Sequence, residues 1–515
     1  MVQQESRVKK TLLNARVNLI FYFLTLALSF FSRKIFLDCL GANFVGLTGT
    51  LQNLLGFLNL AELGIGSAIG YLLYKPLFEH DQQKINEIIS VMGYLYRWIG
   101  IIILAAGIIL SFFLPLIFPD SDTGFSLPLI YFAYFSFLGS SLIGYFINYR
   151  QNLLGADQRN YVVTAYFQSA TIIKTLVQMV LAYYTANYYL WVVVEFAFGI
   201  IYSFILNWKI NQTYPWLKAE VAQGKKLFRK YPEVMTKTRQ LFVHKIAAFV
   251  QNQTTPFLIY SFVSLQIVAF YGNYTIITDK ISQLVNNFLG STDAGVGNLI
   301  AENNSAKIEK VFWELVAVRY YVAGTVVFLI YMLMNPFISL WLGPQYILND
   351  TVLGLLLFKF FIGQIRGATD QFLFGYGLFY DTWAPIAEGV IYLIVAIIGG
   401  YLWGLPGILL GGCISLLIII CGWKPYFLFR SGFKLPQKKY WLNIIKYVLI
   451  AIFTMVGMAY YIPKIFTIVN PYAGALDWLI YALFLTISFS LVYLLIMYVL
   501  TQGMRNALAR TYMKK

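Results

Sequence analysis

The sequence predicts an all-α polytopic membrane protein with about 14 transmembrane helices. Three observations support this prediction: hydrophobic residues make up 59% of the 515 residues, charged residues make up only 12%, and the mean hydropathy is +0.68. Soluble domains contain about 25% charged residues and about 45–50% apolar residues. Because each spanning helix needs roughly 20 apolar residues, this composition excludes a soluble enzyme, a disordered chain and a coiled coil.

Apolar stretches separated by turns and charges give the order of the helices. The first span, at 17–36, follows four basic residues and has no small-residue cleavage site, so we interpret it as an uncleaved helix rather than a signal peptide. The later spans are expected at 45–73, 89–118, 126–148, 161–183, 188–208, 242–263, 270–300, 311–335, 352–374, 382–402, 405–423, 441–463 and 476–500. Of these, 45–73 and 270–300 contain many Gly and polar residues and give the weakest apolar signal.

Lysine and arginine are distributed unevenly between alternate loops. With the N-terminus in the cytoplasm, the cytoplasmic segments hold 27 of them, whereas the outer segments hold only Lys464. This asymmetry predicts cytoplasmic N- and C-termini. The net charge of +16 is then explained by loops that contact anionic membrane lipids, and no nucleic-acid partner is expected.

Three sequence matches recur in the same order along the chain. LGIGSAI at 63–69 resembles AGVGNLI at 294–300, the segment around Arg97 resembles that around Arg319, and QNLLGAD at 151–157 resembles QFLFGYG at 371–377. The common offset of six helices predicts that helices 1–6 and helices 7–12 are two copies of one unit. An even helix number gives both copies the same orientation, so we expect two six-helix lobes related by a pseudo-twofold axis along the membrane normal, plus two C-terminal helices.

The repeat also predicts the domain organisation. An N-terminal lobe at 1–208 holds helices 1–6, and a C-terminal lobe at 241–428 holds helices 7–12. A basic cytoplasmic linker at 209–240 joins them, and 429–515 holds helices 13 and 14 with a basic tail. Two lobes of this kind are expected to enclose a central cavity.

Cysteine and histidine are too few and too scattered for a metal centre. The three cysteines lack CxxC spacing, and the chain has only two histidines. No metal site, no cofactor and no Ser-His-Asp triad is therefore expected.

Charged residues inside apolar spans are the site candidates, because burying an ionisable group in lipid is costly. Lys174 and Glu195 lie at similar distances from a turn near 185, which predicts an ion pair across a helix hairpin. The alternative is that one of them acts on substrate or in gating. Arg366 and Asp370 are four residues apart and can pair on one helix face, which Lys359 shares.

Arg97 and Arg319 occupy matching repeat positions, each about a third of the way into its helix. Small and polar residues recur around Arg97 at helical spacing, namely Ser90, Gly93, Gly100, Gly107 and Ser111. This stripe is either the wall of a water-filled cavity or a surface for close helix packing. Arg33 and Lys34, near the outer end of the first helix, are either cavity cations or interfacial anchors.

Four stretches resemble bacterial polysaccharide-biosynthesis flippases. The most specific is NLAELGIGSAIGYLLYKPLFEHDQQKINEI at 59–88, and the others are SRKIFLDCLGANFVGL at 32–47, FINYRQNLLGADQRNYV from position 146 and GNLIAENN at 297–304. They are similar to the Wzx-like members of the multidrug/oligosaccharidyl-lipid/polysaccharide exporter superfamily. The resemblance covers helices 1–12.

This resemblance implies movement of a polyprenyl-diphosphate-linked oligosaccharide from the cytoplasmic to the outer leaflet of the bacterial cytoplasmic membrane. The expected partners are that lipid-linked oligosaccharide and other polysaccharide-assembly proteins. Arginine suits a diphosphate because its planar fork donates two hydrogen bonds. The candidate substrate-binding cations are Arg97, Arg319, Arg33, Lys34, Lys359 and Arg366. The membrane potential or a coupled Na⁺ or H⁺ would supply the driving force.

Two other functions compete with this one. A multidrug antiporter would need carboxylates in its cavity, and the candidates are Glu62, Asp279, Asp293, Glu314 and Glu388, the last also a candidate for gating or an ion pair. A glycan polymerase or ligase would need a sizeable outer loop with catalytic residues. The longest expected outer loop, 336–351, holds one acid, Asp350, so we do not expect an enzyme.

Overall fold

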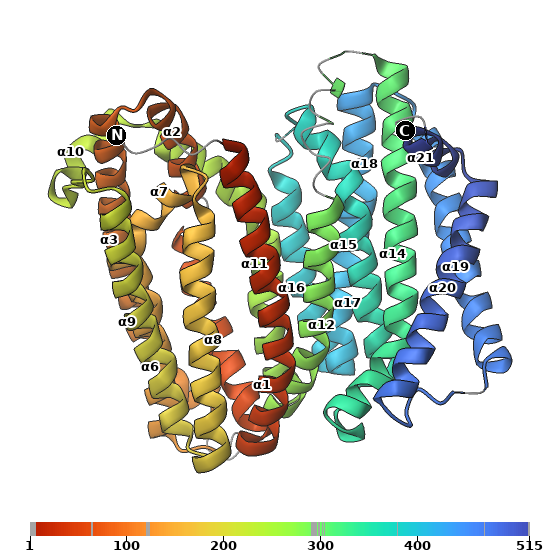
Figure 1. The fold of residues 1–515 in the computed structure, drawn as a ribbon, viewed down its shortest axis with the longest axis horizontal. Coiled ribbons are helices and arrows are strands. Elements are labelled where there is room, and N and C mark those ends of the chain that lie inside the picture. The colour runs from red at the N-terminus through yellow and green to blue at the C-terminus, as the bar shows by residue number, and fades with distance from the viewer. Residues whose placement is uncertain are drawn as a thin grey trace. The chain divides into compact units, whose positions relative to one another are not determined.

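The computed structural model describes residues 7–62, 65–119, 124–289, 296, 299–300, 302, 304–378, 380–467 and 469–512. Helices dominate these residues, and no strand occurs among them (Figure 1). Ten helices of the described part are long and apolar enough to cross a membrane. The prediction of an all-α polytopic membrane protein is therefore confirmed.

The chain divides into two compact units, Met1–Ala269 and Phe270–Lys515. The helices of the first unit are α1 (Arg7–Leu58), α2 (Ile65–Glu79), α3 (Gln82–Ser111), α4 (Leu114–Ile117), α6 (Leu127–Phe146), α7 (Gln151–Ala156), α8 (Asn160–Thr185), α9 (Tyr188–Thr213), α10 (Gly224–Lys230) and α11 (Glu233–Phe262). Short 3-10 turns lie at Asn59–Glu62, Asn148–Arg150 and Val221–Gln223. Figure 1 shows α3, α6, α8 and α9 as long columns of this unit.

The second unit begins within α12 (Leu265–Leu289). Its other helices are α14 (Ser305–Trp341), α15 (Asp350–Gly375), α16 (Trp383–Trp403), α17 (Leu405–Leu416), α18 (Lys424–Phe427), α19 (Gln437–Ile465), α20 (Ala475–Leu500) and α21 (Gln502–Tyr512). A 3-10 turn lies at Pro344–Tyr346. A π-helical turn, Leu417–Trp423, completes the span expected at 405–423. α18 and a second π-helical turn, Leu428–Phe433, continue the helix beyond it.

Some expected spans are more polar than the ten apolar helices. The span expected at 45–73 starts in the second half of α1, and three others correspond to α8, α11 and α12. None of these three is among the ten helices that qualify by length and composition. Their polar side chains make α8, α11 and α12 candidates for binding polar ligands.

Gly41 divides α1 into two helical halves. Its φ of 83° and ψ of 158° lie outside the helical region, in backbone space that favours glycine. The break falls between the first two expected spans. Five residues on, Gly46 faces the first turn of α12, where an added Cβ would lie 2.0 Å from the carbonyl oxygen of Leu265.

The small-residue stripe of α3 is a packing surface. An added Cβ at Gly100 would lie 2.8 Å from the Phe146 ring, and one at Gly107 would lie 2.8 Å from Leu138. The Tyr134 hydroxyl donates to the carbonyl oxygen of Gly107 at 2.7 Å. The stripe therefore holds α6 against α3, as small residues do in membranes.

The segment expected as a linker docks on the first unit. Glu87 of α3 accepts hydrogen bonds from Lys230 at 2.7 Å and from Tyr231 at 2.6 Å. Burial raises the pKa of the Tyr231 hydroxyl, and the Glu87 carboxylate raises it further. The next helix, α11, also packs here, with Phe249 edge-on to Phe57 of α1. The division between the two units thus falls later in the chain than 209–240.

Close packing also organises the second unit. An added Cβ at Gly399 of α16 would lie 2.5 Å from the carbonyl oxygen of Gly407 of α17. Phe328 of α14 stacks on Phe489 of α20 with ring centroids 3.9 Å apart. Part of the basic tail folds as α21, where Arg510 forms an ion pair with Glu314 of α14 at 3.1 Å.

Candidate functional site

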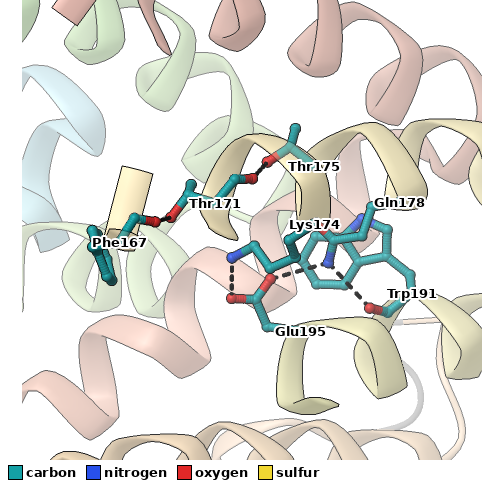
Figure 2. A network of polar contacts seen from close by, with 7 residues as sticks. All are labelled: Phe167, Thr171, Lys174, Thr175, Gln178, Trp191 and Glu195. Carbon is teal, nitrogen blue, oxygen red and sulfur yellow. Dashed lines mark hydrogen bonds and ion pairs between the residues drawn. The ribbon is translucent and has the colours of Figure 1, made fainter. Parts of the chain in front are cut away.

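Lys174 and Glu195 lie in contact across the α8–α9 hairpin. Lys174 Nζ is 2.6 Å from Glu195 Oε1, and the two side chains are only 20% and 19% exposed. Gln178 donates to the second carboxylate oxygen at 3.0 Å and to the carbonyl oxygen of Trp191 at 3.1 Å (Figure 2). Both oxygens of the carboxylate are therefore occupied, and the charges of the two residues cancel within the hairpin.

Arg366 and Asp370 form an ion pair on α15. Arg366 Nε donates to Asp370 Oδ2 at 2.7 Å, with side chains 33% and 26% exposed. Glu388, which is 6% exposed on α16, interacts electrostatically with the same guanidinium. Arg366 is therefore in contact with one carboxylate, on α15, and within electrostatic range of a second, on α16.

Lys359 lies two turns before Arg366 on α15. Its electrostatic partners are Asp279 of α12 and Glu388 of α16. Its Nζ lies 3.9 Å from the position of an added Cβ at Gly412 of α17. We name Asp279, Lys359, Arg366, Asp370 and Glu388 the α15 charge cluster. Its two cations are accompanied by three acids, so its charges largely compensate one another.

Arg319 is enclosed in the second unit. It is 5% exposed and donates from Nη1 to the carbonyl oxygen of Gln364 at 3.1 Å. An added Cβ at Gly367 would lie 2.1 Å from that nitrogen. Gln364 in turn donates to Ser282 of α12 at 2.5 Å. Arg319 thus joins α14 to α15.

Arg97 lies in a different environment. Its side chain is exposed, while Tyr96 beside it is buried. Within the described part of the chain, Arg97 makes no hydrogen bond or ion pair. The two arginines at matching repeat positions therefore differ in burial and in partners.

Arg33 and Lys34 point to different partners. Arg33 donates from Nη2 to the carbonyl oxygen of Ala269 at 2.7 Å, which ties α1 to the first turns of α12. Lys34 lies 3.4 Å from Asp38, four residues on, and both side chains are about half exposed. The two basic neighbours thus do not act as one patch.

Two further polar groups were, apart from Glu62, not singled out from the sequence. Tyr96 donates to Glu62 at 2.5 Å, and Tyr145 donates to Asn59 at 2.9 Å, around the turn that precedes α2. Asp381, which is 2% exposed, pairs with Lys424 at 2.7 Å. A search for charges in apolar spans misses both, because Tyr and Asn are uncharged and because Asp381 and Lys424 lie outside the expected spans.

The carboxylates expected for an antiporter have partners where they are described. Glu62 accepts from Tyr96, Glu314 pairs with Arg510, and Glu388 interacts with Arg366. Asp293 lies outside the described residues. In the part of the chain that the structure covers, no group of three His, Cys, Asp or Glu side chains is placed to hold a metal ion.

The fold resembles solved structures of membrane transporters and flippases. It resembles the structure of the lipid II flippase MurJ in an inward closed conformation, with a TM-score of 0.60 at 14% sequence identity. That match covers 93% of this chain and 98% of the flippase.

Two multidrug-transporter structures are also similar. An inward-facing MATE family transporter of the MOP superfamily has a TM-score of 0.56 at 15% identity, covering 82% of this chain and 99% of the transporter. A MATE in complex with MaD3S has a TM-score of 0.50 at 16% identity, covering 82% and 96%. The chain therefore shares its fold with these three transporter structures. No protein-family model and no curated protein sequence matches it.

Proposed function

We propose that the protein moves a polyprenyl-diphosphate-linked oligosaccharide from the cytoplasmic to the outer leaflet for surface polysaccharide biosynthesis. The observation that carries this proposal is the extent of the fold match. The flippase covers more of this chain than either multidrug transporter does, by about the length of two spanning helices. The chain carries two C-terminal spanning helices, α19 and α20, beyond the twelve of the expected repeat.

A cleft on α19 and α20 is consistent with a substrate that carries a lipid chain. It has a volume of about 450 Å³ and is lined by apolar side chains of α19 and α20, with Lys446 as its only cation among the described residues. An apolar cleft of this kind suits a hydrocarbon chain, and an ammonium at its wall suits an anionic head. A second apolar cleft, between α1 and α3, has no cation in its described lining.

The cation candidates differ in what they can offer a diphosphate. Arg97 is exposed and unpaired in the described part of the chain, so its fork is available for two hydrogen bonds. Lys359 and Arg366 face carboxylates, so we assign them to alternating access rather than to primary anion binding. An inside-negative potential favours outward movement of an anion by about 2.3 kcal/mol per charge per 100 mV.

Because multidrug transporters have a similar fold, the second candidate function is export of organic cations coupled to Na⁺ or H⁺. A reconstituted assay separates the two. The purified chain is placed in vesicles with a fluorescent polyprenyl-diphosphate oligosaccharide, and a membrane-impermeant quencher reports its leaflet. Protein-dependent flipping supports the flippase. Ethidium uptake driven by an ion gradient, without flipping of the lipid, would instead support the antiporter.

A further inference from the structure

One face of α8 is polar along most of the helix. Asn160, Thr164, Gln168, Thr171, Thr175 and Gln178 follow one another at spacings of three or four residues. This spacing places them on one side of the helix. α8 is 26 residues long, yet it is not among the helices that are apolar enough to span by composition. Polar groups at membrane depth need polar partners within the protein or water.

The C-terminal half of this face finds such partners. The hydroxyls of Thr171 and Thr175 donate to carbonyl oxygens one turn earlier in α8, at 2.9 and 2.8 Å (Figure 2). Gln178 is bound to Glu195 and to Trp191, as described above. These groups are satisfied within the hairpin.

The N-terminal half of this polar face of α8 does not find such partners. Among the described residues, the side chains of Asn160, Thr164 and Gln168 make no hydrogen bond. All three line a cavity of about 420 Å³ between α6, α7, α8 and α9. This volume is within the range of ligand pockets, about 300–1,000 Å³. Its lining includes four amides, Asn148, Gln151, Asn160 and Gln168, and we name it the amide pocket.

The base of the amide pocket is rigid. Asn148, which is 4% exposed, donates to the Ser203 hydroxyl at 2.8 Å and accepts from Asn207 at 3.0 Å. Arg150 donates to Asn207 at 2.8 Å and to Asn211 at 2.9 Å. This network joins the turn after α6 to α9 and fixes the walls before any ligand arrives, which reduces the entropy cost of binding.

Two aromatic rings complete the lining. Phe167 and Tyr202 meet edge-to-face with centroids 5.2 Å apart. The Tyr202 hydroxyl points to Gln151 at 3.5 Å. None of the described lining residues is charged. An ionic ligand would therefore be desolvated without a counterion, which is unfavourable.

The chemistry of this lining fits a neutral sugar. The amides of Asn160 and Gln168 each offer donors and an acceptor, and the hydroxyls of Ser140 and Thr164 offer both as well. This combination matches the alternating donors and acceptors of a polyhydroxylated ring. The aromatic rings offer an apolar surface to its C–H face. We infer that the amide pocket binds an uncharged sugar residue of the substrate.

This inference rests on the proposed function and adds a site to it. On the topology that the basic loops predict, the segment 149–160 is cytoplasmic. The amide pocket would then receive the glycan on the side where the lipid-linked unit is made. The diphosphate, held elsewhere, is recognised by charge, whereas the sugar is recognised by hydrogen bonds.

The test uses the full chain in lipid nanodiscs free of sugar-based detergent. The probes are methyl β-glycosides of glucose, galactose and N-acetylglucosamine, and binding is followed by saturation-transfer NMR. At least one glycoside is expected to bind. The double variant Thr164→Val, Gln168→Met should weaken that binding at least tenfold. Because neither side chain has a protein hydrogen bond, its melting temperature should not fall.

The matched control is Thr171→Val, Thr175→Val, on the same face but with hydroxyls bonded to their own helix. It should bind the glycoside as the unchanged chain does. No binding by any glycoside, or equal binding by the double variant, would overturn the inference. Flipping of the lipid-linked glycan, measured in parallel, keeps the two proposals separate: flipping without glycoside binding removes only the amide pocket, and glycoside binding without flipping removes only the flippase.

Discussion

Lys174 of α8 and Glu195 of α9 form an ion pair of 2.6 Å, and Gln178 occupies the second oxygen of the same carboxylate. Three side chains thus satisfy each other inside the α8–α9 hairpin. Breaking a buried pair by removing one partner typically costs about 3–5 kcal/mol, because the other charge is left buried and unpaired. The pair is therefore a structural element on which the first unit depends.

We expect Lys174→Glu and Glu195→Lys each to reduce membrane abundance and melting temperature, since each variant places two like charges in contact. The double reversal should restore most of both quantities, because the opposite charges meet again. Thermal unfolding in nanodiscs measures the effect. A double variant as unstable as the single ones would show that the two charges do not act as a pair.

Arg97 and Arg319 should respond differently to truncation. Arg97→Ala leaves no carboxylate unpaired, so we expect normal membrane abundance with at least tenfold slower flipping of the lipid-linked glycan. Arg97→Lys should recover part of the rate, since an ammonium keeps the charge but loses the bidentate fork. Flipping measured beside protein abundance gives both values.

Arg319→Ala removes an enclosed side chain that binds a backbone carbonyl, so we expect lower abundance and a lower melting temperature. Full flipping by a well-folded Arg97→Ala variant would remove Arg97 from the mechanism.

Gly41 should be intolerant of substitution. At a φ of 83°, Gly41→Ala places a Cβ in a strained conformation, at an expected cost of about 1–3 kcal/mol in the free energy of unfolding. Gly49→Ala is the matched control, because that glycine is helical and has no atom within 4 Å of an added Cβ. We expect Gly49→Ala to be neutral or stabilising by up to about 1 kcal/mol. Equal melting temperatures for the two variants would contradict the strain.

Arg510 should stabilise α14 through Glu314. The carboxylate is 5% exposed on its side chain, whereas Arg510 is 45% exposed. Arg510→Ala leaves Glu314 buried without its cation, and we expect a loss of about 1–3 kcal/mol. Glu314→Gln in the Arg510→Ala background should recover stability, because the charge is gone. A melting temperature that is unchanged by Arg510→Ala would show that α21 is held by apolar contacts alone.

Much of the fold could be predicted because a helix that spans a bilayer must be apolar over about 20 residues. Runs of about 20 apolar residues stand out, and the break after the first run coincides with Gly41. The π-helical form of Leu417–Trp423 could not be predicted, since these residues keep the same apolar composition as a regular helix. The division at Ala269 depends on which helices α11 packs against, and no local pattern carries that information.

The site candidates were less predictable because partners come from distant segments. Spacing within α15 shows that Arg366 can reach Asp370, but not that Glu388 of α16 approaches the same guanidinium. Arg97 and Arg319 look equivalent in sequence and differ in burial. The amide pocket was readable in part, because Asn160, Thr164 and Gln168 have helical spacing, but a search confined to charged residues passes over it.

The backbone contact between Gly399 and Gly407 has a mechanical consequence for α16 and α17. No side chain separates the two helices at this point, so sliding or rotating one against the other would separate main-chain atoms that are in contact. We therefore expect α16 and α17 to move together as one rigid body. A spectroscopic probe attached to this helix pair would report the tilt of the pair as a whole rather than bending of one helix against the other. Tyr401, which is 81% exposed, offers an attachment point for such a probe, whereas a label at Gly399 or Gly407 would push the two helices apart.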